Sequence, residues 1–323
     1  MTRLVASFIG LTSILIVSTA AGAGWPEKVF APYMYLGAGD NFKVTECADA
    51  CGQKYYTLAF VIADKEGKPA WDGRSDMDQN LYADQITQLR SRGGDVIVSF
   101  GGEGGTEVAI AETNTAALEA KYQSVIDRYK LTWLDFDIEG KALSKVDANE
   151  RRNTVLADLQ AKYPGLRISY TLPVDPNGVS RESRKMLADA KAKGVKVYSA
   201  NVMTMDFGAH FTDGKKMSDV SIASALKAHE QCQAIDPDIL IGLTPMIGQN
   251  DERSEVFSQD DARSLLKWSQ SQPWVCSLSF WASNRDAGKT GKRKNDNVTS
   301  GVTQSPWDFT TIFKPFTSGT GTP

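Results

Sequence analysis

The chain has 323 residues, a formal net charge of −3 and 23% charged residues. Lysine and arginine are scattered along it, so it lacks the basic surface that nucleic acids bind, and no nucleic-acid partner is expected. Without its N-terminal segment the chain keeps about 300 residues, which is room for one large barrel or two modest domains.

The N-terminal segment has the three parts of a secretory signal peptide. Arg3 supplies the positive charge, Leu4–Val17 the apolar core, and Ala21-Gly22-Ala23 a cleavage site of small residues. The apolar core is too short to span a bilayer, and no later apolar run is long enough. We therefore expect residues 1–23 to be a signal peptide and residues 24–323 to form a single secreted, extracellular domain without a membrane span.

From residue 29 onward, short apolar runs alternate with amphipathic stretches of helical period. The predicted strands are Val29–Tyr35, Tyr55–Ile62, Asp95–Phe100, Trp133–Glu139, Leu166–Leu172, Val195–Met205, Ile239–Thr244 and Cys276–Trp281. The predicted helices are Asn80–Arg92, Ala116–Tyr129, Asp147–Tyr163, Arg181–Lys193, Val220–Ala234 and Asp260–Ser271, and the final segment Trp307–Phe316 is expected to pack back on the barrel.

This alternation of strands and helices predicts an α/β fold, a (β/α)8 TIM barrel of parallel strands. A doubly wound open sheet is the alternative, but no G-x-G-x-x-G follows the first strand. Because only a short connection joins Thr244 to the helix at Asp260, no large insertion domain is expected.

Four cysteines in a secreted chain suggest two disulfides, for which three connectivities exist. We expect the pairs Cys47–Cys51 and Cys232–Cys276. The sequon that begins at Asn297 is a possible glycosylation site in a host able to modify it.

The predicted strand Trp133–Glu139 places three carboxylates on one face, because side chains alternate across a strand. The acidic face consists of Asp135, Asp137 and Glu139, and the apolar face of Leu134, Phe136 and Ile138. Carboxylates about 7 Å apart repel one another, which raises at least one pKa and leaves an acid protonated, as a general acid must be. In a barrel they would line the interior near the active-site end. A solvated acidic edge strand is the alternative.

Four motifs resemble those of the family 18 glycoside hydrolases, the chitinases and their relatives. Asp135–Glu139 is similar to the end of the family's D-x-x-D-x-D-x-E signature, and Ser99–Gly102 to its S-x-G-G. Met203–Asp206 aligns with M-x-Y-D, and Trp281 with the eighth-strand tryptophan under the scissile sugar. The resemblance covers nearly all of residues 24–323.

The resemblance implies retaining hydrolysis without an enzymatic nucleophile, an exception to the two-carboxylate scheme. Glu139 would protonate the glycosidic oxygen while the substrate's own 2-acetamido oxygen attacks the anomeric carbon, which gives an oxazolinium ion. Asp137 would orient the acetamido group and stabilise the positive charge, and Asp135 would tune Asp137 from below. Water activated by Glu139 would then open the ring with retention.

Sugar-binding residues are also expected around these acids. The flat faces of Trp281, Tyr33 and Phe60 suit the C–H faces of a pyranose, although each of these rings also suits a barrel interior. Gly101 and Gly102 would let backbone approach the sugar closely or leave room for the acid.

The chain departs from the family pattern at two positions. Thr132 stands where the signature has its first Asp, and Met205 where M-x-Y-D has Tyr, so the hydroxyl expected to hold the acetamido oxygen is missing. The flanking Met203 and Asp206 are still expected to line the site. Gln249 is our candidate replacement, because its amide donates hydrogen bonds.

Three functions fit these residues. The first is an endo-acting chitinase that cleaves β-1,4 bonds between N-acetylglucosamine units, with chitin or its oligosaccharides as the partner and internal cleavage expected from an open, insertion-free cleft. The second is a chitin-binding lectin that does not hydrolyse, although Glu139 is retained. The third is an endo-β-N-acetylglucosaminidase acting on N-glycans.

Competing chemistries are poorly supported. The chain has two histidines, His210 and His229, so a three-histidine zinc site is impossible, and no nucleophile elbow supports a Ser-His-Asp triad. We therefore expect no metal and no cofactor, and we expect a monomer.

Overall fold

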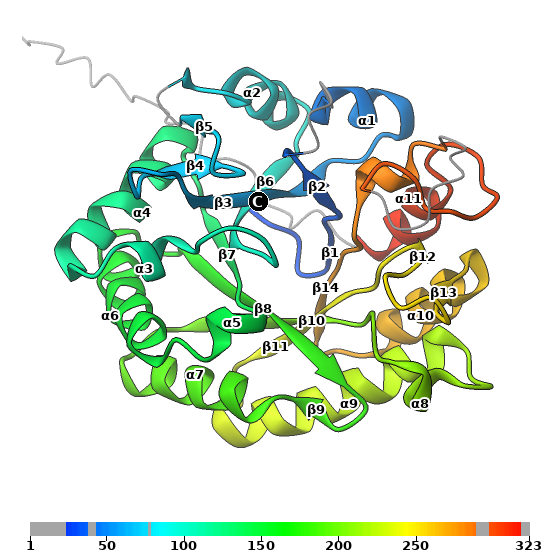
Figure 1. The fold of residues 1–323 in the computed structure, drawn as a ribbon. Coiled ribbons are helices and arrows are strands. Elements are labelled where there is room, and N and C mark those ends of the chain that lie inside the picture. The colour runs from blue at the N-terminus through cyan, green and yellow to red at the C-terminus, as the bar shows by residue number, and fades with distance from the viewer. Residues whose placement is uncertain (1–23, 38–42, 77–78, 289–296, 318–323) are drawn as a thin grey trace, which may run out of the picture.

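The computed structural model describes residues 24–37, 43–76, 79–288 and 297–317. The predicted signal peptide, residues 1–23, lies outside this part of the chain. Parallel strands form a closed ring with helices around it, so the predicted (β/α)8 barrel is confirmed (Figure 1). In order round the ring the barrel strands are β1 (Val29–Phe30) with β2 (Tyr33–Tyr35), β3 (Tyr55–Ala63), β6 (Asp95–Gly101), β7 (Trp133–Asp137), β8 (Arg167–Asp175), β10 (Val197–Met203), β11 (Leu240–Thr244) and β14 (Val275–Leu278).

The barrel closes through its first strand, which is divided into two pieces. β1 pairs in parallel with β14 on one side, and β2 pairs in parallel with β3 on the other. The predicted strand Val29–Tyr35 is interrupted near Pro32, which has no N–H to donate to a strand ladder. The ring is thereby complete without a long first strand.

The outer layer consists of the helices that follow the barrel strands. Each predicted helix is present within a few residues of its expected ends: α2 (Ala83–Ser91), α4 (Thr115–Tyr129), α6 (Val146–Lys162), α7 (Arg181–Ala192), α9 (Met217–Ile235) and α10 (Gln259–Ser271). The sequence did not predict α1 (Val44–Cys51), the four-residue helices α3 (Val108–Ala111), α5 (Gly140–Leu143) and α8 (Ala209–Thr212), or the small strands β4 (Pro69–Trp71), β5 (Ser75–Asp76), β9 (Gly178–Val179), β12 (Gly248–Gln249) and β13 (Val256–Phe257). Elements this short carry too few residues to show a period.

Side chains along β7, and Ile138 and Glu139 directly after it, point as the alternation predicts. Leu134, Phe136 and Ile138 are fully buried in the main hydrophobic core, between the strands and the surrounding helices. The opposite side chains form an acidic row (Asp135, Asp137 and Glu139) that points into the barrel and toward its C-terminal mouth. The apolar face therefore anchors the strand, and the acidic row is available for chemistry.

The C-terminal segment packs back on the barrel, as expected. It forms α11 (Asp308–Phe313) and the 3₁₀ turn η3 (Lys314–Phe316). The Phe313 ring centroid lies 5.7 Å from that of Phe30 and 6.0 Å from that of Phe280. Asp286, at the end of the 3₁₀ turn η2 (Ser283–Asp286), accepts the N–H groups of the first turn of α11. This segment thus covers the barrel where β1 and β14 meet.

A buried ion pair lies behind β7. The Arg152 guanidinium on α6 is fully buried and donates to Glu107 Oε2 at 2.7 Å. Glu107 caps α3 through the N–H of Ala109 and accepts a 2.8 Å hydrogen bond from Tyr122. The guanidinium also lies 5.9 Å from the ring of Phe136 on β7. These contacts tie the segment after β6 to α6 and to the back of the acidic strand.

The four cysteines are free thiols, so neither predicted disulfide is present. The Sγ atoms of Cys47 and Cys51 lie 3.7 Å apart on α1, well beyond the S–S bond length of about 2.05 Å. Cys232 packs in the outer core from α9, whereas Cys276 lies at a register shift in β14, with its Sγ 3.9 Å from the hydroxyl of Ser277 inside the barrel. The wall of the barrel therefore separates the second pair.

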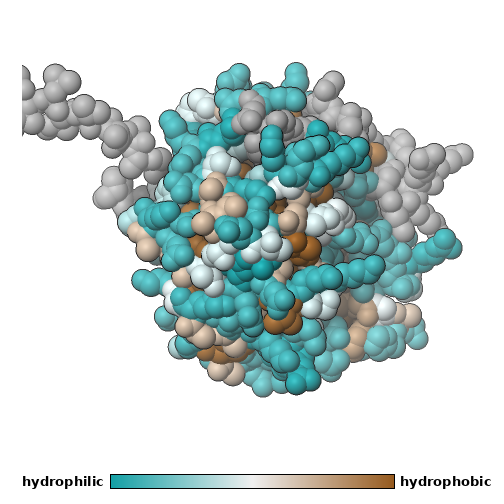
Figure 2. Space-filling model, turned by 60° about the vertical axis from the view of Figure 1, so that its left-hand side comes forward, coloured by the Kyte–Doolittle hydropathy of each residue, from teal (hydrophilic) through white to brown (hydrophobic). Residues whose placement is uncertain are grey.

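The surface of the described residues is largely hydrophilic. In the view of Figure 2, hydrophobic residues occur in small separate patches. The exposed large hydrophobic residues are Val146, Leu226 and Val256, which lie far apart in the sequence. No helix in the described ranges is both long enough and apolar enough to cross a bilayer.

The buried ion pair generates a stability prediction. Replacing Arg152 by Met leaves Glu107 buried without its cation, so the free energy of unfolding should fall by about 3–5 kcal/mol in urea denaturation. The double variant Arg152→Met with Glu107→Gln should recover part of this loss because the uncompensated charge is gone. Arg263→Met is the control: it breaks an exposed pair with Asp260, and should change stability by less than about 1 kcal/mol. Equal effects at the two arginines would contradict the prediction.

Candidate active site

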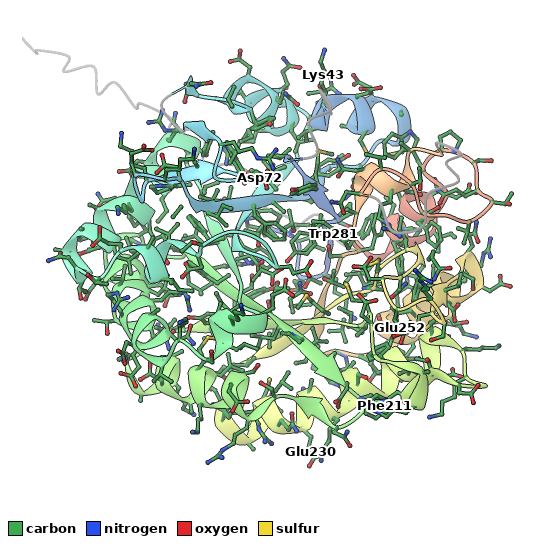
Figure 3. All side chains as sticks on the ribbon, in the orientation of Figure 1. Lys43, Asp72, Phe211, Glu230, Glu252 and Trp281 are labelled. Carbon is green, nitrogen blue, oxygen red and sulfur yellow. The ribbon has the colours of Figure 1, made fainter. Side chains whose placement is uncertain are left out.

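A cleft of about 690 Å³ opens at the C-terminal mouth of the barrel. It contains the upper part of the acidic row and most of the sequence-predicted site residues: Asp137, Glu139, Tyr33, Phe60, Gly101, Met203, Met205, Asp206 and Trp281. Figure 3 shows Trp281 near the centre of the barrel, with Asp72 and Glu252 on different sides of it. Asp135, Gly102 and Gln249 are not part of its lining.

Asp135 lies below the cleft and is 2% exposed. Its Oδ2 accepts hydrogen bonds from Ser99 Oγ at 2.7 Å and Tyr33 OH at 3.0 Å, and its Oδ1 from Ser169 Oγ at 2.7 Å and Thr171 Oγ1 at 2.9 Å. Burial raises the pKa of Asp135, and these hydroxyl donors oppose that rise. The arrangement matches an ionised carboxylate, which only accepts hydrogen bonds.

Asp137 and Glu139 form a coupled pair above it. Asp137 is 4% exposed, and burial together with the charges of Glu139 and Asp135 holds its pKa well above the usual range. Burial and the carboxylates of Glu103 and Asp206 raise the pKa of Glu139 to about 7, while the hydrogen bond from Asp137 lowers it. Near neutral pH the two carboxyl groups therefore share a proton.

One oxygen of this pair, on a residue that lines the cleft, has no protein partner. Asp137 Oδ1 is buried and has no hydrogen-bond partner among the described residues. Buried polar atoms are nearly always paired in folded proteins. Asp137 Oδ1 is therefore a built-in acceptor for a donor group that enters the cleft.

Two glycines allow the β6 end to pack against the pair. Gly101 has φ +98°, and a Cβ there would lie 2.2 Å from the carbonyl oxygen of Asp137. Gly102 has φ +87° and donates its N–H to the same oxygen at 3.0 Å, and a Cβ there would lie 2.8 Å from the Phe60 ring. Gly101 lines the cleft, whereas Gly102 lies against the Phe60 ring and is not part of the lining. Their close neighbours are thus the Asp137 backbone and the Phe60 ring, both within the protein.

Aromatic rings form one wall of the cleft. Trp281 stacks on Phe60 with ring centroids 5.5 Å apart and an interplanar angle of 13°. Tyr33 and Tyr35 lie 5.9 and 5.7 Å from Trp281, centroid to centroid. Tyr33 is 2% exposed and its hydroxyl is bound to Asp135, so it supports the acidic row. Trp281, Phe60 and Tyr35 are partly exposed and supply the accessible aromatic surface.

The segment after β10 contributes thioethers in place of the expected hydroxyl. Met203 and Met205 line the cleft together with Met246, which follows β11. A thioether sulfur is only a weak acceptor and donates nothing. Asp206, at φ +50°, accepts the backbone N–H of Glu252 at 2.8 Å, which joins the two loops on this side of the cleft.

Gln249 does not replace the missing tyrosine, so this expectation is wrong. Its side-chain amide donates to the carbonyl oxygens of Asn250, Arg253 and Glu255 at 3.3, 3.2 and 2.9 Å. The amide is used to close the loop between β12 and β13, and the residue lies outside the cleft lining. Thr132, the other departure, is exposed below β7 and accepts the Trp25 indole N–H at 2.9 Å.

Known proteins resemble this chain closely enough to define its family. It is 32% identical over 313 residues to a probable bifunctional chitinase/lysozyme of Escherichia coli strain K12, and 33% identical over 279 residues to endochitinase 11 of Metarhizium anisopliae. These alignments cover 91% and 81% of this chain, which spans only 35% and 53% of the lengths of the two relatives. No protein-family model matches the chain.

A solved structure decides the family. It is a catalytic-site mutant of active domain 2 of a thermostable chitinase from Pyrococcus furiosus, complexed with chito-oligosaccharides. It is 31% identical to this chain with a TM-score of 0.81, and the match covers 91% of this chain and 96% of that one. The chain belongs to the family 18 glycoside hydrolases, the chitinase family.

The structure brings further residues into this family 18 cleft that the sequence analysis did not select. They are Tyr35, Ile62, Asp72, Glu103, Gly104, Thr171, Thr244, Met246, Asp251, Glu252 and Asn297. Glu103 follows the S-x-G-G motif directly, so its position in sequence was an available signal. Asn297 begins the glycosylation sequon, and the others belong to no motif. The described lining contains no lysine, arginine or histidine, and this excess of carboxylates favours the protonated form of Glu139.

The described residues contain no group of three or more His, Cys, Asp or Glu side chains placed to hold a metal ion. The acidic groups of the described cleft lining are its carboxyl groups and the phenols of Tyr33 and Tyr35, whose pKa values burial raises.

The packing at Gly101 generates a matched pair of variants. Gly101→Ala forces an L side chain into a positive φ and against the Asp137 carbonyl, so the free energy of unfolding should fall by about 2 kcal/mol or more. Gly104→Ala in the same loop is the control because a Cβ there meets no atom within 4 Å. Urea denaturation of both variants checks the difference, and a Gly101→Ala protein as stable as Gly104→Ala would refute it.

Proposed function

We propose that the protein is a secreted, monomeric, endo-acting chitinase that hydrolyses β-1,4 bonds between N-acetylglucosamine units with retention. The observation that carries the proposal is the Asp137–Glu139 pair, which shares a proton beside an unpartnered Asp137 Oδ1 and a stacked aromatic wall. A substrate-assisted reaction needs these three features: an acid, an acceptor for the acetamido N–H, and a flat surface for the sugar.

In the proposed reaction Glu139 donates the proton that it shares with Asp137 to the glycosidic oxygen. The acetamido carbonyl oxygen attacks the anomeric carbon as the bond to the leaving oxygen breaks, which gives an oxazolinium ion. Asp137 Oδ1 accepts the acetamido N–H and so orients the attacking group. Once the shared proton has left, both carboxylates of the pair are ionised beside the cation, and preorganised charge of this kind stabilises a transition state.

The second half of the proposed reaction returns the proton. Glu139, now a carboxylate, takes a proton from a water molecule that attacks the anomeric carbon on the face opposite the acetamido group. The two displacements together give retention. Asp135 touches no reacting atom in this scheme; its negative charge helps to keep a proton on the pair above it.

The endo mode is supported by the short connection between β11 and α10. Within the described residues it holds only the small β12–β13 pair, so it places no additional domain over the cleft. Secretion rests on the signal peptide predicted for residues 1–23. A lectin on the same scaffold would have no need of the raised pKa at Glu139, so we favour the enzyme.

Glu139→Gln tests the assigned acid. With chito-oligosaccharides, kcat/KM should fall by about 10²- to 10⁴-fold because the general acid is lost, while binding measured by calorimetry persists. Mass spectrometry of wild-type products should show internal cleavage of the longer oligosaccharides. Glu230→Gln on the outer surface of α9 (labelled in Figure 3) is the control and should leave kcat/KM unchanged. Binding without cleavage by the wild type would select the lectin.

The pKa of Glu139 generates a pH prediction. The acid must be protonated, so wild-type kcat/KM should decline above pH 7, the approximate pKa of Glu139. The carboxylate of Glu103 raises this pKa, so Glu103→Gln should lower it and move the decline to lower pH. Glu230→Gln should leave the pH profile in place. A decline that stays put or moves to higher pH in Glu103→Gln would contradict the electrostatic assignment.

A further inference from the structure

The cleft contains few side-chain donors for the oxygen atoms of a sugar. Met205 has replaced the expected tyrosine, and the described lining has no lysine, arginine or histidine. Each hydroxyl or indole of the described lining already donates to a protein oxygen: Tyr33 to Asp135 at 3.0 Å, Tyr35 to Asp72 at 2.9 Å, Thr171 to Asp135 at 2.9 Å, Thr244 to Asn201 at 2.9 Å and Trp281 to Asn297 at 3.2 Å.

Asn297 is the one residue of the described lining whose side-chain amide N–H groups are not bound to a protein oxygen. Its Oδ1 accepts the Trp281 indole N–H, and because an indole nitrogen only donates, this bond fixes which side of the amide is oxygen. The Nδ2 group, with two N–H donors, therefore points away from the indole nitrogen, and the residue is exposed and lines the cleft. Among the described residues, none accepts a hydrogen bond from this Nδ2 group.

We propose that Asn297 is a substrate-binding residue, whose Nδ2 group donates a hydrogen bond to an oxygen of the N-acetylated sugar that stacks on Trp281. The inference rests on the proposed chitinase function. Asn297 thereby acts on both sides of its amide: the oxygen holds the edge of the aromatic wall, and the nitrogen binds the sugar. It supplies a polar donor in a cleft where Met205 supplies none.

The sequon gives this nitrogen a second possible use. N-linked glycosylation of Asn297 would join a glycan to the same Nδ2 atom and place it in the cleft. The test therefore needs protein from a host that does not glycosylate the sequon, with its mass checked. Under these conditions any effect of a substitution comes from the side chain itself.

Two variants separate the donor from the anchor. Asn297→Asp keeps an acceptor for the Trp281 indole but loses both N–H donors, whereas Asn297→Ala loses both functions. In the Glu139→Gln background, the Kd for chitohexaose should rise about threefold to tenfold in both, as expected for one hydrogen bond. Asn177→Asp, the same change in an exposed turn, should leave the Kd unchanged. Thermal unfolding verifies that every variant is folded.

The outcomes are distinguishable. If Asn297→Asp binds within twofold of its parent while Asn297→Ala binds more weakly, Asn297 only anchors Trp281 and the inference is overturned. If both variants bind like the parent, it is also overturned. If the wild type does not cleave chitohexaose and the Glu139→Gln variant does not bind it, the proposed function itself fails and this inference fails with it.

Discussion

The structure depends on how one strand accommodates three carboxyl groups on the same face. Full ionisation of the acidic row (Asp135, Asp137 and Glu139) in a buried barrel would be costly, because like charges repel strongly where water is excluded. Two different environments resolve the conflict. Asp135 is surrounded by hydroxyl donors, which compensate a negative charge, whereas Asp137 and Glu139 share a proton. Adjacent residues of one row thus take different protonation states.

The strength of the acid is set by loops from outside this strand. Glu103 follows β6 and Asp206 follows β10, and their charges join burial in raising the pKa of Glu139. The loop that carries Glu103 leads into Glu107, whose ion pair with Arg152 fixes that segment to α6. The outer layer of the fold therefore helps to hold the segment whose carboxylate raises this pKa.

Local sequence patterns were sufficient for the barrel and for the acidic row. Alternation over Trp133–Glu139 assigned the faces of β7, and the periods of the flanking runs located the barrel strands and their helices. Both patterns depend only on residues close together in the sequence, so they can be recognised without knowledge of any tertiary contact. The aromatic wall was predicted only in part: Trp281 and Phe60 were selected from position and resemblance, whereas Tyr35, two residues after Tyr33 in the same predicted strand, was missed.

Tertiary structure alone decided how side chains from distant loops are used. Gln249 and Asn297 both carry a side-chain amide near the barrel mouth. The Gln249 amide donates hydrogen bonds within its own loop, whereas Asn297 lines the cleft. Cys232 and Cys276 stay apart because a register shift in β14 turns one thiol toward the barrel interior. The sequence by itself determined which residues share a strand face or a helix. The fold decided which oxygens and thiols meet, because such contacts depend on loop paths and strand register.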